Sequence, residues 1–424
     1  MTCCEVTQTG EGPICRPGGK QMGSAIAETH RPHTSARRSA WRNLILFLYL
    51  LYGILVNVVL FGIPLRAMSL GASEILLGGL VSGFVSTGVV FSFIGAALCD
   101  RFGERSLLII AFGCYTLGLA VGVVAVSPML LLVSAFTAGV GDMLFTVASM
   151  TYLAQLVQDQ GKEISISVAF SLLRIGSVAG LTGAGSIAES RGFEMVFIVG
   201  FFFSIGGALL SVALPRAAME SRPTATPSQG VLGPFKAAYD LFRRNATVRL
   251  VVAITSLGTL GWFTFRSSFY LDYLRRTGMS PARMGLLTSL GSMACIVAPF
   301  VYSLMRSRMR PLAAMVIGLL AAGLGLAVTP FLRTAFLIGA VAIPAQMGDY
   351  FRMPGVYSLL STDTDSEDRP TAMAMMNTSW AGGALVAGPL WGLIVELVGL
   401  STTFYVAGLV TVIGTVALFR LQRR

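Results

Sequence analysis

The sequence predicts an all-α integral membrane protein with twelve transmembrane helices in two pseudo-symmetric six-helix bundles. Three observations support this class: the composition, the length of the apolar runs and an internal repeat. Hydrophobic residues make up 54% of the 424 residues and charged residues only 12%, against about 25% charged residues in soluble domains. A helix needs about 20 apolar residues to cross a bilayer core of roughly 30 Å. The expected spans are 43–65, 75–98, 106–125, 128–153, 164–188, 195–214, 250–271, 284–305, 311–332, 335–360, 370–395 and 399–419.

The basic residues predict the orientation of the chain. The formal net charge is +11, and most Lys and Arg fall in the two tails and in the connections on the same side as the tails. An excess of Lys and Arg marks the cytoplasmic side. We therefore expect a multi-pass protein of the cytoplasmic (plasma) membrane with both termini cytoplasmic, and no nucleic-acid partner. The exceptions on the opposite, outer side are Arg66, Arg191, Arg275, Arg276, Arg283 and Arg333.

Polar stretches divide the chain into five parts. The N-terminal residues are rich in Gly, Ser, Thr and Arg, which is typical of disorder. Residues 221–230 have a flexible linker composition, and residues 234–244 predict an amphipathic helix at the membrane surface. The expected parts are a disordered cytoplasmic tail 1–42, an N-terminal six-helix bundle 43–214, a cytoplasmic linker with the amphipathic helix 215–249, a C-terminal six-helix bundle 250–420 and a cytoplasmic C-terminus 421–424.

The two halves of the chain repeat one another. A single shift places Gly141-Asp142 on Gly348-Asp349, and we call this shift the repeat register. Further matches in the same register are Gly176 with Gly383, Gly185 with Gly392, Glu189 with Glu396, Gly192 with Gly399 and Phe197 with Phe404. Two acids and an aromatic residue in one register indicate related halves, and parallel halves of six spans are a transporter architecture.

The connection between the second and third spans is short and charged. It runs from Gly95 to Arg105 and carries Asp100, Arg101 and Glu104. This stretch resembles the signature loop of the major facilitator superfamily, G-x-x-x-D-[RK]-x-G-[RK]-[RK]. Gly95 stands one residue further from Asp100 than in the tightest form of the motif, and Glu104 takes a basic position. With the spans and the repeat, the resemblance extends over almost the whole chain.

The resemblance implies two bundles that rock around one central site, and it implies a role for the charged connection. Asp100, Arg101 and Arg105 are expected to hold a cytoplasmic gate through contacts with helix ends of the other half. Gly95 allows helices to approach closely, and Gly103 allows a backbone turn that other residues adopt only at a steric cost. In the alternative interpretation, the charges of this connection only fix the topology.

Two carboxylates are expected deep in the membrane. Asp142 and Asp349 lie in the fourth and tenth spans, about 14 residues or 21 Å from the outer ends. By the resemblance, the first, fourth, seventh and tenth spans line the central cavity. A charge at the bilayer centre costs about 2.5–3.5 kcal/mol on insertion scales, so it indicates function. With no histidine in any span, we expect these acids to couple protons or bind substrate; a structural ion pair or gate is the alternative.

Three arginines lie within the expected spans. Arg352 follows Asp349 by three residues and shares its helix face, and Arg174 lies near the midplane within reach of Asp142. Arg266 lies on an expected cavity helix; the alternative is that it extends to the outer interface beside an acid. Three arginines against two aspartates would tolerate an anionic or zwitterionic substrate.

Small residues predict close helix packing in the fifth and eleventh spans. The packing residues are Gly176, Gly180, Gly388, Pro389 and Gly392, and the proline is expected to bend its helix. Drug and proton antiporters of the superfamily carry G-x-x-x-G-P-x-x-G-G in the fifth span and an arginine in the fourth. This chain differs from them at Leu181, Ala184 and Ala135.

Together these features predict a secondary active transporter that moves a small organic molecule by alternating access. Proton-coupled efflux, in the manner of an antiporter, is the preferred hypothesis. The expected partners are a small-molecule substrate, protons and the lipid bilayer, and the expected state is a monomer. The alternatives are uptake of an anionic solute such as an organic acid or metal chelate, and a non-transporting membrane sensor. No enzyme activity, cofactor or metal site is expected, because no nucleophile–base set, phosphate loop or metal-ligand spacing occurs.

Overall fold

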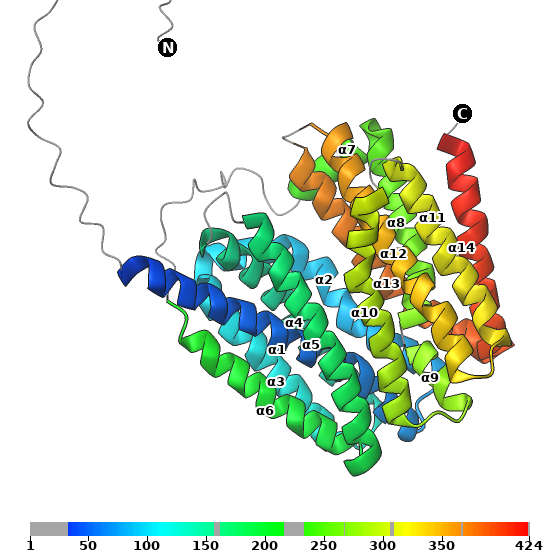
Figure 1. The fold of residues 1–424 in the computed structure, drawn as a ribbon, viewed down its shortest axis with the longest axis horizontal. Helices are drawn as coiled ribbons and strands as arrows, with labels where there is room; N and C mark the ends of the chain where they lie inside the picture. The colour runs from blue at the N-terminus through cyan, green and yellow to red at the C-terminus, as the bar shows by residue number, and fades with distance from the viewer. Residues whose placement is uncertain are drawn as a thin grey trace, which may run out of the picture. The chain divides into compact units, whose positions relative to one another are not determined.

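Every regular element of the described residues is helical (Figure 1). The computed structural model describes residues 33–156, 162–215, 233–266, 268–305, 309–365 and 368–422. It divides into two units, Met1–Ala40 and Trp41–Arg424, and the second unit is the subject below. The helices are α1 His33–Ser69, α2 Glu74–Phe102, α3 Glu104–Val124, α4 Pro128–Leu156, α5 Lys162–Arg191, α6 Phe193–Val212, α7 Gly233–Arg244, α8 Ala246–Arg266, α9 Ser268–Arg276, α10 Pro281–Met305, α11 Pro311–Val328, α12 Ala335–Asp363, α13 Arg369–Val398 and α14 Leu400–Gln422, with a short 3-10 helix η2 at Thr329–Phe331.

The predicted fold class is confirmed. Nine helices of the described residues are long and apolar enough to cross a membrane, and shorter apolar stretches lie in α2 and α8. α12 stands outside both sets because Gln346, Asp349 and Arg352 interrupt its apolar run. The seventh expected span, 250–271, is covered by α8 and α9, and the helix expected over 234–244 is α7. Of the expected disordered tail 1–42, residues 1–32 lie outside the described residues, whereas residues 33–42 are helical and belong to α1. Most of the linker, residues 216–232, also lies outside the described residues.

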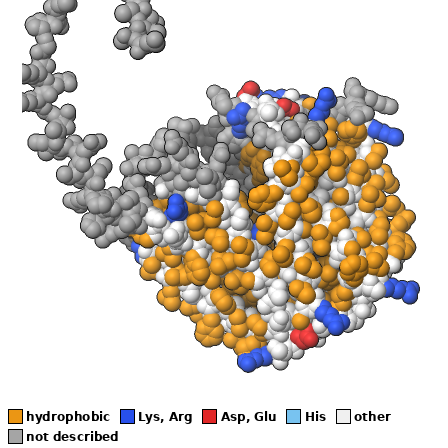
Figure 2. All heavy atoms as spheres, in the orientation of Figure 1, with side chains coloured by type: hydrophobic (Ala, Val, Ile, Leu, Met, Phe, Trp, Pro, Cys, Tyr) orange, Lys and Arg blue, Asp and Glu red, His pale blue; other side chains and the backbone are white. Residues whose placement is uncertain are grey.

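Apolar side chains cover the outside of the second unit. Figure 2 shows them over the middle of the visible face, with basic and acidic side chains toward its upper and lower ends. Large apolar residues such as Phe202, Leu209 and Leu397 are exposed in this unit. A face of this kind suits contact with lipid tails, with the charged groups near the lipid headgroups.

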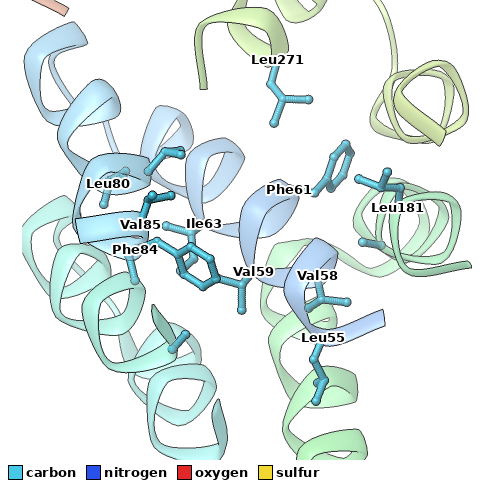
Figure 3. Packing of buried hydrophobic residues seen from close by; sticks show 14 of the residues in the cluster. Leu55, Val58, Val59, Phe61, Ile63, Leu80, Phe84, Val85, Leu181 and Leu271 are labelled. Carbon is cyan, nitrogen blue, oxygen red and sulfur yellow. The ribbon is translucent and has the colours of Figure 1, made fainter. Parts of the chain in front are cut away.

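Buried apolar side chains from several helices meet inside the same unit. Figure 3 shows Leu55 and Phe61 of α1, Phe84 of α2, Leu181 of α5 and Leu271 of α9 in one cluster. Segments that are far apart in the sequence therefore pack together, and they bring the first half (α1–α6) against the second half (α8–α14).

The repeat register reappears in the backbone. Gly71 and Gly278 occupy equivalent turns, with φ of 75° and 80°, and Gly192 and Gly399 both have φ of 85°. A residue with a Cβ rarely adopts this left-handed conformation. Equivalent glycines thus shape equivalent connections. The sequence comparison had not identified the pair Gly71 and Gly278.

Equivalent close contacts also occur between helices. A Cβ on Gly141 of α4 would lie 2.6 Å from the carbonyl oxygen of Ala111 in α3, and a Cβ on Gly348 of α12 would lie 2.5 Å from that of Gly318 in α11. Ala111 and Gly318 correspond in the repeat register. The acids that follow these glycines are therefore positioned by matching helix crossings.

Candidate functional site

A cavity of about 340 Å³ lies among α1, α2, α4, α5, α12 and α13. Both halves contribute to its wall. Four of the five intramembrane charges expected from the sequence line it, namely Asp142, Arg174, Asp349 and Arg352. The side chain of the fifth, Arg266, lies outside the described part of the structure.

Hydroxyl groups hold the carboxylate of Asp142. The Tyr52 hydroxyl donates to Oδ1 at 2.6 Å and the Tyr115 hydroxyl donates to the same oxygen at 3.1 Å. Tyr52 also lies 3.2 Å from Oγ1 of Thr146. Because the single proton of Tyr52 is donated to Asp142, Thr146 is the donor in that contact. Among the residues that the structure describes, no Lys or Arg forms an ion pair with Asp142.

Sequence reasoning did not identify these tyrosines. A signal existed for Tyr52, because Tyr49 and Tyr52 are three residues apart and share one face of α1, and both line the cavity. Tyr52 is fixed in place by stacking on Phe145, with ring centroids 4.0 Å apart. No pattern in the sequence pointed to Tyr115, which is buried between α3 and α4.

Asp349 has a different kind of partner. Nε and Nη2 of Arg352 donate to its Oδ1 at 3.1 and 2.8 Å, as the three-residue spacing predicts. Both side chains are buried, with 6% of Asp349 and 2% of Arg352 exposed. The third nitrogen, Nη1 of Arg352, is buried without a hydrogen-bond partner. The guanidinium lies against Gly258 of α8, where a Cβ would come within 2.9 Å of Cζ and Nε.

Asp142 and Asp349 correspond in the repeat register, yet their surroundings differ. The position of Arg352 is taken in the first half by Phe145, and the position of Tyr52 is taken in the second half by Thr259. One acid is therefore paired with a cation and the other is held by neutral hydroxyl groups. The halves share a backbone plan but not the chemistry of the site.

Arg174 does not bond Asp142, which the sequence had placed within its reach. Its Cζ lies 4.8 Å from the centroid of the Tyr350 ring in α12. This cation–π contact joins α5 of the first half to α12 of the second. Both residues line the cavity, so Arg174 presents positive charge there without a carboxylate partner among the described residues.

The charged connection between α2 and α3 makes its described contacts within the first half. Gly103 turns the chain with φ of 77°, and Arg105 donates to the carbonyl oxygen of Val212 at the end of α6. Arg101 is exposed and lies over its neighbour Phe102. The Asp100 side chain and the surroundings of Gly95 lie outside the described side chains. The gate role of this connection stays a prediction.

The glycines predicted to pack helices are in close contact. A Cβ on Gly176 would lie 2.2 Å from the carbonyl oxygen of Leu50, and a Cβ on Gly180 would lie 2.6 Å from that of Ile54. At Gly392 of α13 a Cβ would meet the carbonyl of Glu74 at 2.6 Å. Gly388 contacts α2 in the same way. Pro389 lies inside α13, which continues through it to Val398.

Comparison with known proteins assigns the family. The sequence model of the Major Facilitator Superfamily matches residues 45–364 and 251–424. The chain belongs to the Major Facilitator Superfamily. It is therefore a multi-pass membrane transporter of this superfamily, and the resemblance found in the sequence is confirmed.

Several relatives and solved structures of the Major Facilitator Superfamily resemble the chain. An uncharacterized MFS-type transporter of Bacillus subtilis, YqjV, is 19% identical over 79% of this chain and 81% of its own length. The lincomycin resistance protein of Streptomyces lincolnensis is 28% identical over 42% of this chain and 37% of its own. The crystal structure of a mutant of the nucleoside transporter NupG superposes with a TM-score of 0.79 at 16% identity, covering 90% of this chain and 99% of the NupG chain. At that identity the likeness shows a shared fold.

Proposed function

We propose that this transporter couples protons to the export of a small amphipathic organic molecule, and that it works as a monomer by alternating access. The observation that carries the proposal is the setting of Asp142. This carboxyl group lines the cavity, accepts hydrogen bonds from two tyrosines and has no cationic partner among the described residues. Its proton can therefore be gained and lost without breaking an ion pair.

Asp142 suits proton transfer better than Asp349 does. Protonating Asp349 would leave the buried guanidinium of Arg352 without its counter-ion, and an uncompensated buried charge is costly. Protonating Asp142 exposes no such charge. We assign the coupling role to Asp142 and a fixed ion-pair role to Asp349 with Arg352.

The cavity wall supports an amphipathic substrate. Besides the four ionisable groups, Phe84, Phe145 and Trp380 line the cavity. A volume of about 340 Å³ falls within the range of about 300–1,000 Å³ that is usual for small-molecule sites. The names of two relatives, the lincomycin resistance protein and the putative multidrug resistance protein MdtD of Cronobacter sakazakii, support export as the direction.

The remaining roles follow from the same scheme. Both termini are placed in the cytoplasm, and Asp100, Arg101 and Arg105 are assigned to an inner gate that forms when the cavity closes on that side. Arg266 is assigned to the cavity helix α8. The two halves on either side of residues 215–249 act as the moving bundles.

Proton-driven transport in proteoliposomes tests the proposal. Uptake of lincomycin and of a cationic dye would be measured with and without an imposed pH gradient, together with proton flux. We expect Asp142→Asn to retain exchange without a gradient and to lose accumulation driven by the gradient. Asp349→Asn should impair both activities because it leaves Arg352 unpaired. Glu194→Gln, on the outer surface, is the matched control. Gradient-driven accumulation by Asp142→Asn would refute the assignment.

A second candidate function is uptake of an anionic solute. It is favoured by the unpartnered Nη1 of Arg352 and by Arg174, which has no carboxylate partner among the described residues. Arg174→Gln and Arg352→Gln separate the two candidates. Loss of binding of an organic acid, with proton coupling retained, would favour the anion.

A further inference from the structure

Two glutamates connect the halves of the transporter at the outer ends of α5 and α13. Oε2 of Glu189 in α5 accepts a hydrogen bond from the backbone N–H of Ala282 in α10, at 2.9 Å. Oε1 of Glu396 in α13 accepts one from the backbone N–H of Ile75 in α2, at 3.3 Å. Each bond therefore runs from one half to the other.

The two bonds are equivalent under the internal repeat. Glu189 corresponds to Glu396, and Ile75 corresponds to Ala282. Both donors are the second residue of their helix, because α2 begins at Glu74 and α10 at Pro281. The chain thus makes the same contact twice, with the roles of donor half and acceptor half exchanged.

The chemistry of the contact favours an ionised carboxylate. The first N–H groups of a helix have no partner within the helix, and the helix dipole places partial positive charge at this end. A carboxylate there forms a charge-assisted hydrogen bond. Both glutamates are exposed, so each contact is weak enough to be made and broken.

Close backbone packing lies directly behind each glutamate. Gly185 of α5 faces Gly285 of α10, with each built Cβ 3.2 Å from the other's Cα. On the other side, a Cβ on Gly392 of α13 would lie 2.6 Å from Cα of Ile75 in α2, and Gly392 corresponds to Gly185 in the repeat register. The glutamates therefore lie at the tips of two seams along which the halves are already in contact.

We propose that Glu189 and Glu396 form a pair of outer latches, one for each seam, which hold the outer side closed and must both release before the transporter opens outward. The proposal rests on the alternating-access function proposed above. It assigns a positioning role in that cycle to two residues away from the cavity.

The surroundings make the latches unequal. Glu189 is supported by the Ser280 hydroxyl and by the positive charge of Arg283. Glu396 has the carboxylate of Glu74 close enough for the two charges to repel each other, and its hydrogen bond is the longer of the two. Loss of Glu189 should therefore open the outer side more than loss of Glu396.

A distance measurement in lipid nanodiscs tests the latches. Spin labels at Val126→Cys and Phe336→Cys, on a cysteine-free background, report on the outer openings of the two halves. Both positions are 82% exposed; Val126 lies in the connection between α3 and α4, and Phe336 lies at the start of α12. We expect Glu189→Ala with Glu396→Ala to raise the outer-open population roughly tenfold. Glu189→Ala alone should exceed Glu396→Ala alone. The Gln pair should have a smaller effect, because an amide oxygen still accepts.

Glu194→Ala is the matched control, since Glu194 pairs with Arg66 in its own half at 2.9 Å. It should leave the distances unchanged. Distances in the double Ala variant that superimpose on those of the labelled parent, in protein that elutes as a single folded species, would overturn the latch proposal. The distance measurement needs no substrate, so it is independent of the transport assay. Absence of flux in proteoliposomes would refute the transport mechanism, and the distances would still test the latches.

Discussion

Gly78 of α2 and Gly388 of α13 meet so closely that neither position has room for a side chain. A Cβ on Gly78 would lie 2.0 Å from the carbonyl oxygen of Gly388, and a Cβ on Gly388 would lie 2.2 Å from that of Gly78. This contact joins the first half to the second. The seam between α2 and α13 therefore depends on two glycines that lie directly against each other's backbone.

Gly388→Ala should separate α2 from α13. The added methyl group overlaps backbone atoms, and rotating a side chain cannot remove this overlap. We therefore expect the free energy of unfolding to fall by about 1–3 kcal/mol. The apparent Tm of the purified protein in detergent measures it. Gly382→Ala in the same helix has no atom within 4 Å of its Cβ and should melt like the parent. Equal Tm values for the two variants would contradict the contact.

Gly258→Ala should disturb the ion pair without touching either charge. The new Cβ would lie 2.9 Å from Cζ and Nε of Arg352, so the guanidinium must move away from Asp349. We expect the initial transport rate to fall roughly tenfold, as a cost of about 1.4 kcal/mol implies. Gly183→Ala, which meets nothing within 4 Å, is the control. A normal rate for Gly258→Ala would show that the pair tolerates displacement.

Tyr52→Phe should change the pH dependence of transport. The substitution removes the donor at 2.6 Å from Oδ1 of Asp142, and a hydrogen bond to a carboxylate favours its ionised form. With that donor gone, the Asp142 carboxylate keeps only the longer hydrogen bond from Tyr115, at 3.1 Å, so the pH–rate profile should differ from that of the parent. Rates measured from about pH 5 to 9 check this. Tyr49→Phe, whose hydroxyl accepts from Ser149 at 2.9 Å instead, should reproduce the parent profile.

Removing the two arginines that pair with Asp272 should destabilise the protein. This aspartate is fully buried. Nη2 of Arg275 donates to Oδ1 at 2.9 Å, and Nε of Arg276 donates to Oδ2 at 2.6 Å. Arg275→Gln with Arg276→Gln leaves a buried carboxylate without a cation, which costs about 3–5 kcal/mol.

The apparent Tm measures this loss, and a third substitution tests its cause. Adding Asp272→Asn to the two Gln substitutions removes the uncompensated charge, and the triple variant should recover most of the lost Tm. Arg276 also bonds Glu74 of α2, so the recovery should be incomplete. A triple variant that melts as low as the double variant would mean that the arginines act in some other way.

The sequence predicted the helices well because their signal is local. Apolar runs end where charged or turn residues begin: the span expected over 106–125 is α3, Glu104–Val124. The pairing of Asp349 with Arg352 was predicted for the same reason, since three residues along a helix fix their separation. Local spacing is enough where the helix itself supplies the geometry.

The partners of Asp142 could not be predicted in this way. Tyr52 and Tyr115 are 90 and 27 residues away from it, and only the packing of α1, α3 and α4 brings them together. The same limit explains Arg174, which contacts Tyr350 across the halves where the sequence suggested a neighbour in its own half. The repeat did contain a usable clue. Phe145 takes the position of Arg352 in the repeat register, which indicates that Asp142 lacks the arginine partner of Asp349.

In the proposed cycle, the charges that face the cavity would also determine how the membrane voltage acts on transport. With Asp142 ionised, the two carboxylates and the guanidiniums of Arg174 and Arg352 cancel. With Asp142 protonated, the same wall carries one positive charge. An electric field across the bilayer contributes up to about 2.3 kcal/mol per elementary charge at 100 mV, so a cell with a negative interior would pull the proton-loaded form inward and leave the return of the unloaded form almost unaffected.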